Sequence, residues 1–250
     1  MMRNNVFCCM HFILRLKLTT VILILLTRIR YFRDLGYPYE SSFISSTNNI
    51  DLLMYSYTSD TKYSKTAGGL ILLKPSTDAA LLQYAATSSF LSKLYSDYLQ
   101  LLRTPSRRCS DSDSVFSSES LKQFSLSQVN YILGDNPLKT SYVVGYGNTY
   151  HQAASIPWDG ERRDCSEGSQ WLNSRRENPN TIFGAMVAGP NKDDVFSDKR
   201  IKSWFTEPTI ASNAGLVAAL VALHDPPTAS SLGNLGIDKH GMFENVKEVS

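Results

Sequence analysis

The chain has 250 residues, with 25 Lys and Arg against 23 Asp and Glu, which gives a formal net charge of +2. A balance this close to neutral argues against nucleic acid or an anionic membrane surface as a partner. With 42% hydrophobic residues the composition is that of a globular protein, long enough to bury one large core or two small ones.

The N-terminal stretch, MMRNNVFCCMHFILRLKLTTVILILLTRIR, is apolar but frequently interrupted by charge. Its longest uncharged run, residues 18–27, is shorter than the roughly 18 to 20 residues of a membrane-spanning helix. Arg15 and Lys17 break the apolar region of a signal peptide, and no small-residue cleavage site precedes Arg28. We expect residues 1–23 to form an irregular segment or a core helix, with a signal peptide as the alternative and no transmembrane segment.

Two amphipathic helices are predicted in the middle of the chain. The first spans residues 81–103 and repeats apolar side chains at helical spacing: Phe90, Leu91, Leu94, Tyr95, Tyr98 and Leu101. The second spans residues 120–134 and is ended by Gly134 and Pro137. The Ser-rich stretch between them, residues 104–120, shows no periodicity and is expected to be a loop.

Residues 135–208 are irregular and rich in Gly, Pro and Asn, and loop regions of this length are usually functional when they are ordered. A last helix is predicted over residues 213–224, with Ser212 or Asn213 as its N-cap. It is apolar nearly all round and is therefore expected to be buried. The tail, residues 225–250, is expected to be loose. Since little of the chain alternates with period two, the fold class is all-α.

The cysteines and histidines indicate neither a metal site nor a cofactor. Cys109 and Cys165 could pair in an oxidising compartment, but the sequence does not give their separation. Neither a Cys-x-x-Cys nor any other zinc-ligand spacing occurs among the four cysteines or the four histidines, His11, His151, His224 and His240.

Glu207 has the setting expected of a sugar-cleaving acid. It follows Trp204 and Phe205, and Pro208 disfavours a helical backbone at Glu207, so this glutamate is expected in a loop before the final helix. A carboxyl partly desolvated by aromatic rings suits a general acid, but a solvated glutamate near a helix N-terminus would show the same pattern. Asp198, nine residues earlier, is one of several acids in NKDDVFSDKR and could simply be a solvated turn residue.

Several segments resemble plant glycoside hydrolase family 9 endoglucanases, and chiefly their C-terminal half. They are QVNYILGDNPLKTSYVVGYG, NPNTIFGAMVAGP and FSDKRIKSWFTEPTIASNAGLVAAL, preceded in the same order by LLTRIRYFRDLGYPYE, GGLILL and FLSKLYSDYL. The tail GIDKHGMF is most similar to the membrane-anchored, KORRIGAN-type subgroup. The resemblance implies that residues 24–224 are the C-terminal part of a family 9 catalytic domain, forming an incomplete (α/α)6 barrel of helical hairpins.

The resemblance also implies inverting hydrolysis of internal β-1,4-glucosidic bonds in cellulose-like glucans. Glu207 matches the general acid of the family and Asp198 a supporting carboxylate. The motif continues through Thr209, Asn213 and Ala214, but Ser203 stands where the family has an aromatic residue, with Trp204 displaced by one. A groove lined by Tyr146, Trp204 and Arg200 is expected to bind the glucan, with Asp198, Glu207 and His151 converging on it.

Two parts of the family's site are altered or missing. The family's His-x-Arg element falls on Tyr150 and Gln152, so that His151 is only the neighbour of the expected histidine. The Asp-Ala-Gly-Asp motif that carries the catalytic base does not occur. We therefore expect a truncated and inactive endoglucanase, with a non-catalytic glucan-binding remnant as the alternative. A membrane-anchored scaffold finds no support in the N-terminal segment. The family acts in the cell wall or at secretory and plasma membranes, but these residues do not fix the compartment.

Overall fold

The computed structural model describes residues 40–59, 65–73, 80–101, 103–108, 115–150, 172–173 and 181–224. The named elements within these ranges are α2 (Glu40–Thr58), α3 (Leu82–Leu101), β1 (Ser106–Arg108), β2 (Val115–Ser117), α4 (Ser118–Leu133), α6 (Ser203–Thr206) and α7 (Ile210–Leu223). Helices dominate, as expected of the all-α class, and the two short strands form one hairpin.

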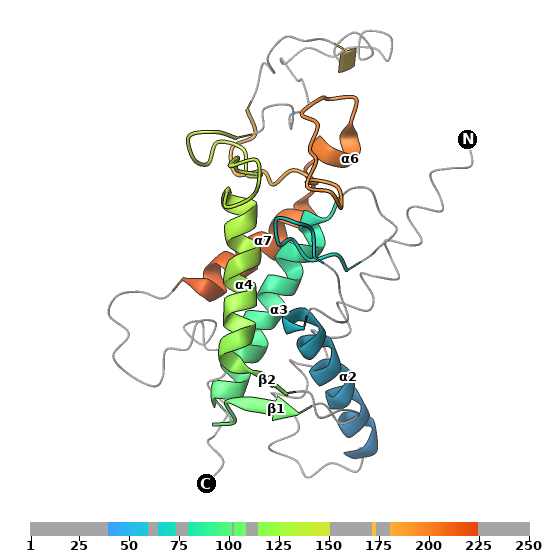
Figure 1. The fold of residues 1–250 in the computed structure, drawn as a ribbon, viewed down its shortest axis with the longest axis vertical. Coiled ribbons are helices and arrows are strands. Elements are labelled where there is room, and N and C mark those ends of the chain that lie inside the picture. Colours follow the sequence, from blue (N-terminus) through green and yellow to red (C-terminus); the bar gives the residue numbers. More distant parts are fainter. Residues whose placement is uncertain are drawn as a thin grey trace, which may run out of the picture.

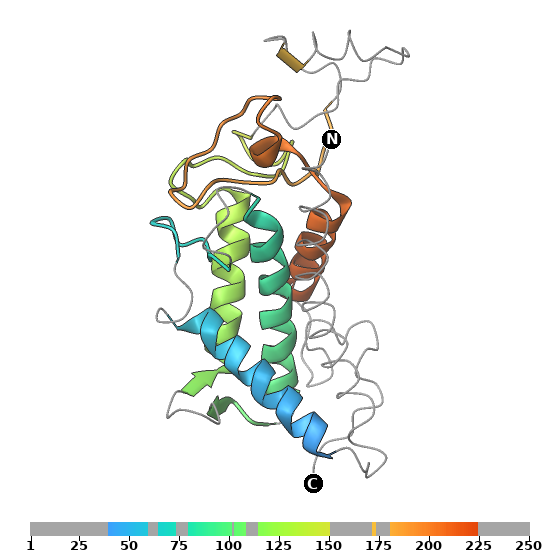
Figure 2. The same ribbon diagram turned by 90° about the vertical axis from the view of Figure 1, so that its right-hand side faces the viewer.

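Helix α3 lies at the centre, packed between α4 and α7 (Figures 1 and 2). Helices α3 and α4 run in opposite directions and are joined through β1 and β2 at one end (Figure 1). Buried serines bridge the two helices, because Ser92 and Ser96 of α3 donate to carbonyls of α4 at 2.8 and 2.7 Å, and Ser125 of α4 donates to a carbonyl of α3 at 2.8 Å. Such small polar side chains let the helices approach closely while satisfying their hydroxyl groups.

Helix α7 approaches α3 closely at Gly215. A Cβ atom at this position would lie 2.7 Å from the hydroxyl oxygen of Thr87 and 3.2 Å from its backbone nitrogen. Any side chain here would push the two helices apart, so Gly215 is required by helix packing.

The predictions for the two central helices are confirmed. Helix α3 covers most of the expected 81–103 segment, and α4 covers the expected 120–134 segment and starts two residues earlier. Gly134 ends α4 with a backbone φ of +125°, which residues other than glycine rarely adopt. The helix starts earlier because Ser117 and Ser120 form a reciprocal capping box.

The prediction of a plain loop over residues 104–120 is wrong. Within it, β1 pairs antiparallel with β2. Long-range contacts hold this hairpin: the Arg107 guanidinium donates to Asp51 of α2 at 2.7 and 3.1 Å, and buried Phe116 packs against Tyr95 of α3. No local periodicity could have revealed these contacts. Helix α2 was likewise not predicted, although Ile50, Leu53, Met54 and Tyr57 in its C-terminal half repeat at helical spacing.

The last helix was predicted inaccurately in two respects. It begins at Ile210, not at 213, because Thr209 is its N-cap in place of Ser212 or Asn213. It is also not buried all round: Leu216, Ala219 and Ala222 are buried, but Ile210 and Val217 are 92% and 56% exposed. Among the described elements α7 contacts α3 and α4, so these helices cover only one of its faces.

The expected gathering of loops is confirmed for residues 135–150 and 181–208. Both segments lie at one end of the α3–α4 pair, opposite the β1–β2 hairpin (Figures 1 and 2). By length and apolarity, Ser203–Leu223 is the one candidate membrane span among the described residues. However, Glu207 and Thr209 are extended, so the longest continuous helix in that stretch is α7 with 14 residues. This makes it weak evidence for a membrane-spanning segment.

Candidate active site

Glu207 lies at the junction between α6 and α7. It ends α6 with an extended backbone (φ −75°, ψ 117°), and its N–H donates to the carbonyl of Ser203 at 2.8 Å. Thr209 is extended as well (φ −133°, ψ 147°). The expectation that Pro208 places Glu207 outside a helix, just before the last one, is confirmed. The side chain is exposed, where a substrate can reach it.

Thr209 fixes the start of α7 two residues after Glu207. Its hydroxyl oxygen accepts a hydrogen bond from the Ser212 N–H at 3.0 Å and lies 2.6 Å from the Ser212 hydroxyl. This N-cap satisfies a backbone donor that the first turn of a helix otherwise leaves unpaired. The threonine of the family motif is therefore structural in this chain: it sets where the helix begins and hence where Glu207 lies.

Asn213, the next matching motif residue, fastens α7 to the 184–186 segment. Its amide nitrogen donates to the Gly184 carbonyl at 2.7 Å, and its amide oxygen accepts from the Met186 N–H at 3.0 Å. Because one side chain makes both bonds, the position of the 184–186 segment is tied to the first turn of α7.

Trp204 lies in α6, three residues before Glu207 in the chain, and is 48% exposed. The ammonium of Lys202 lies 5.1 Å from the ring centroid, within the range of a cation–π contact. Its neighbour Phe205 is buried, and the Phe205 carbonyl accepts the Gly189 N–H at 3.0 Å. One aromatic of this pair therefore anchors α6, while the other remains available for a ligand.

A row of aromatic rings packs between α4 and α6. Ring centroids follow one another at 6.0 Å from Tyr131 to Tyr142, 5.4 Å from Tyr142 to Phe196, and 5.7 Å from Phe196 to Phe205. These contacts join α4, the 141–150 loop, the 191–202 loop and α6 into one packed unit. This row could not be predicted from the sequence, because its members come from separate segments of the chain.

Asp194 clamps the loop that carries Asp198. One carboxylate oxygen accepts from the Tyr131 hydroxyl at 2.6 Å and the other from the Gly68 N–H at 2.6 Å. Asp194 is buried and adopts a left-handed backbone (φ +58°). Burial, and then the hydrogen bond to Asp194, raise the pKa of Tyr131 above the usual range. This structural role was not predicted, since nothing local distinguishes Asp194 from Asp193.

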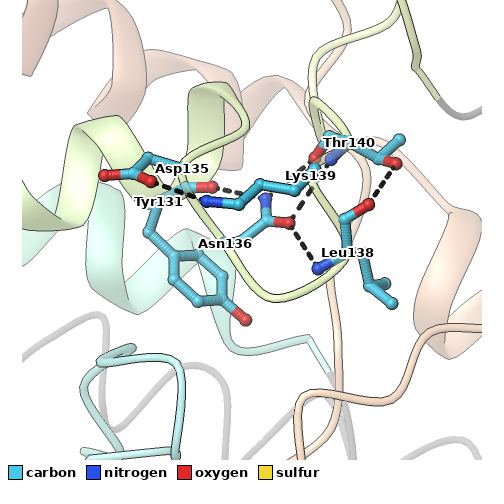
Figure 3. Close-up of polar contacts among 6 residues, drawn as sticks. All are labelled: Tyr131, Asp135, Asn136, Leu138, Lys139 and Thr140. Atoms are coloured by element: carbon cyan, nitrogen blue, oxygen red, sulfur yellow. Dashed lines mark hydrogen bonds and ion pairs between the residues drawn. The ribbon is translucent and has the colours of Figure 1, made fainter.

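The turn after α4 is organised by Asn136 (Figure 3). Its amide nitrogen donates to the carbonyls of Tyr131 and Thr140, each at 2.8 Å, and its oxygen accepts from the Leu138 N–H at 3.1 Å. The exposed ion pair of Lys139 and Asp135, 3.1 Å apart, closes the outer side of the turn. The chain is thereby redirected from α4 into the loop that bears Tyr146.

The remaining candidates are placed as follows. Asp198 is exposed and Arg200 half-buried in the 191–202 loop, and Tyr146 is exposed in the 141–150 loop. Both loops belong to the same end of the helices as Glu207 (Figure 2). His151 lies outside the described residues, so its convergence with Asp198 and Glu207 on one groove stays a prediction. Within the part of the chain that the structure describes, no group of three or more His, Cys, Asp or Glu could hold a metal ion.

Comparison with protein families gives a match to the glycosyl hydrolase family 9 model over residues 12–220. Among similar curated proteins, Endoglucanase 21 of Arabidopsis thaliana is 46% identical over 229 residues, which are 89% of this chain and 36% of that protein. Endoglucanase 10 of Oryza sativa subsp. japonica is 42% identical, with the same coverage of both chains. The chain thus spans little more than a third of the length of these relatives.

Solved structures agree with the fold. The cellulase Cel9M from C. cellulolyticum in complex with cellobiose matches 78% of this chain and 38% of its own, with a TM-score of 0.53 and 25% identity. The catalytic domain of Clostridium thermocellum CelT matches 85% of this chain and 42% of its own, with a TM-score of 0.56 and 18% identity. At 18% identity the latter supports the incomplete (α/α)6 architecture alone.

Proposed function

Because this chain belongs to glycosyl hydrolase family 9, we propose that it supplies the general-acid side of an endo-acting β-1,4-glucan hydrolase. The observation that carries the proposal is the position of Glu207: an exposed carboxyl on an extended junction, fixed by the α6 turn before it and the Thr209 cap after it. An acid held on a rigid backbone can meet a glycosidic oxygen in a reproducible geometry.

In the proposed reaction, Glu207 gives its proton to the glycosidic oxygen as the bond from that oxygen to the anomeric carbon breaks. A water molecule attacks the same carbon from the opposite face, and a second carboxylate takes a proton from this water, so the configuration inverts. Asp198 would hold charge and orientation near the acid. Trp204, Tyr146 and Arg200 would contact the sugar rings, and His151 would complete the site.

The base of this reaction is not evident in the 250 residues. They contain no Asp-Ala-Gly-Asp sequence, and an inverting enzyme needs its base about 6.5 to 9.5 Å from the acid. We therefore propose that these 250 residues alone do not turn over glucan. The exposed Trp204 and Tyr146 favour a second candidate function for the isolated chain, namely glucan binding without hydrolysis. The membrane-anchored subgroup suggested by GIDKHGMF stays a prediction.

A chimera tests the acid directly. This chain would replace the matching 229 residues of Endoglucanase 21 of Arabidopsis thaliana, so that the rest of that protein is present. If Glu207 is the acid, Glu207→Gln lowers reducing-sugar release from carboxymethylcellulose by about 10² to 10⁴-fold. The matched control is Glu119→Gln, which removes an exposed carboxyl in the first turn of α4. An active chimera in which both variants keep full turnover would refute the assignment.

A further inference from the structure

Two β-turns lie back to back among the loops at the active-site end. They span residues 143–146 and 182–185, and each is closed by a 3.2 Å hydrogen bond from the N–H of its fourth residue to the carbonyl of its first. Gly145 and Gly184 occupy the third positions with φ of +78° and +79°, while the second positions have no positive φ. This is the pattern of type II turns, which require glycine or asparagine there.

The two turns are joined to each other. Gly184 N–H donates to the Val144 carbonyl at 2.8 Å, and Val144 N–H donates to the Ala185 carbonyl at 2.9 Å. The ring of Phe183 lies directly on Gly145, because a Cβ atom on Gly145 would overlap it. The paired turns thus seat the Phe183 ring on a flat patch of backbone that only glycine can provide.

Phe183 is far more exposed than is usual for a large apolar side chain. Its side chain is 74% exposed, and Tyr146, the last residue of the partner turn, is 51% exposed. Four backbone hydrogen bonds order the two turns that carry this ring, yet the ring itself is exposed to solvent, so core packing does not explain it. Two exposed aromatics on adjoining turns are the kind of surface on which sugar rings stack.

The paired turns are tied to the acid through α7. Asn213 binds Gly184, the residue after Phe183, and lies in the first turn of the helix that follows Glu207. Two extended steps and about one helical turn separate the Cα atoms of Glu207 and Asn213 by no more than roughly 13 Å. At the other end of the segment, the Gly189 N–H donates to the carbonyl of Phe205, the neighbour of Trp204. Gly189 follows Phe183 by six residues, so the Cα atoms of Gly189 and Phe183 are at most roughly 20 Å apart.

We propose that Phe183, together with Tyr146, forms a stacking platform for one glucosyl unit of a β-1,4-linked glucan. The platform rests on the proposed function, and it assigns to Phe183 a role in affinity and none in chemistry. A glucan chain lying across the loop end would contact Trp204 near Glu207 and Phe183 at the far end of the 184–189 segment. Short oligosaccharides that reach only one of these aromatics would bind more weakly than long ones.

Calorimetric titration of the 250-residue chain with cellohexaose tests the platform. Phe183→Ala is expected to raise the Kd about three- to tenfold, the range of one aromatic stacking contact. Phe183→Tyr should keep the wild-type Kd, since it retains the ring. The control is Ile182→Ala, which removes the neighbouring exposed side chain of the same turn and should leave the Kd unchanged.

The outcomes separate the platform from the proposed function. Equal Kd values for wild type and Phe183→Ala overturn the platform, and the proposed function survives if Trp204→Ala still weakens binding. If the wild-type chain does not bind cellohexaose, both the platform and the glucan-binding candidate function are overturned. If Phe183→Ala weakens binding but Glu207→Gln leaves the activity of the chimera unchanged, the platform is supported and the assignment of Glu207 as the acid of a hydrolase is refuted.

Discussion

The hydroxyl of Tyr131 donates a 2.6 Å hydrogen bond to the buried carboxylate of Asp194, four residues before Asp198. The bond connects helix α4 with the loop that carries Asp198, one of the two candidate carboxylates. The second oxygen of Asp194 accepts the Gly68 N–H, so three separate parts of the chain meet at one side chain. The beginning of the loop that carries Asp198 is therefore held by contacts outside the family motif.

Replacing Asp194 should destabilise the fold. Asp194→Ala leaves the buried Tyr131 hydroxyl and the Gly68 N–H without this acceptor, and we expect a loss of about 2 to 4 kcal/mol in the free energy of unfolding. Urea denaturation followed by circular dichroism measures it. The control, Asp193→Ala, removes the adjacent exposed carboxylate and should change the free energy by less than about 0.5 kcal/mol. Similar losses in both variants would contradict the clamp.

The raised tyrosine pKa values predict a loss of stability at high pH. Burial raises the pKa of Tyr95, Tyr131 and Tyr142 above the usual value of about 10. Above pH 10 the unfolded chain releases protons that the folded chain keeps, so the stability contributed by these groups is full below pH 10 and falls as the pH rises. Each such tyrosine contributes a slope of about 1.4 kcal/mol per pH unit.

Urea titrations between pH 9 and 11 test this sign. Tyr131→Phe should reduce the fall in stability by about one proton's share, because the phenylalanine cannot titrate. A slope that is the same in wild type and Tyr131→Phe would show that this hydroxyl is not protected in the folded state.

Asn213 should couple α7 to the 184–186 segment. Asn213→Ala removes both side-chain hydrogen bonds, and faster amide hydrogen exchange is expected at Met186, whose N–H loses its acceptor. Asn213→Asp keeps the acceptor for Met186 and removes only the donor to Gly184, so Met186 should stay protected. Unchanged exchange at Met186 in Asn213→Ala would show that the bridge is unimportant.

The two faces of α7 should respond in opposite ways to substitution. Leu216 is buried against the helix pair, and Leu216→Ala is expected to cost about 2 to 5 kcal/mol in unfolding free energy. Val217 and Val221 are exposed, and the double change to Ser should raise solubility, because it removes apolar surface from water, without a comparable loss of stability. Ammonium sulfate precipitation and urea denaturation measure the two effects. A large destabilisation by the Val217 and Val221 changes would mean that this face is covered.

The sequence predicted what local patterns control. Apolar spacing and a glycine stop were sufficient for α3 and α4, because both depend on the periodicity of one segment. The β1–β2 hairpin was not predicted because it is held by the ion pair of Arg107 with Asp51, which are far apart in sequence. For the same reason, the sequence did not indicate the roles of Asp194 and Phe183. They depend on the contact of Asp194 with Tyr131 and on the paired turns that hold Phe183.

The candidate site divides in the same way. Glu207 and Asp198 were found from a short contiguous motif, and the extended backbone at Glu207 follows from Pro208 alone. The sequence did not reveal that Thr209 and Asn213 of that motif act as a helix cap and a bridge. Domain limits at residues 23 and 224 stay predictions, as does any pairing of Cys109 with Cys165.

The central claim is that Glu207 is an acid whose partner base is absent from the 250 residues, and reducing-sugar release from carboxymethylcellulose tests it most directly. We predict almost no release by the purified chain, and no measurable change in Glu207→Gln. Robust release that disappears in Glu207→Gln would contradict the account. It would mean that another carboxylate serves as base, and exposed Asp193 would then be the first to replace, since Asp194 is buried in its clamp.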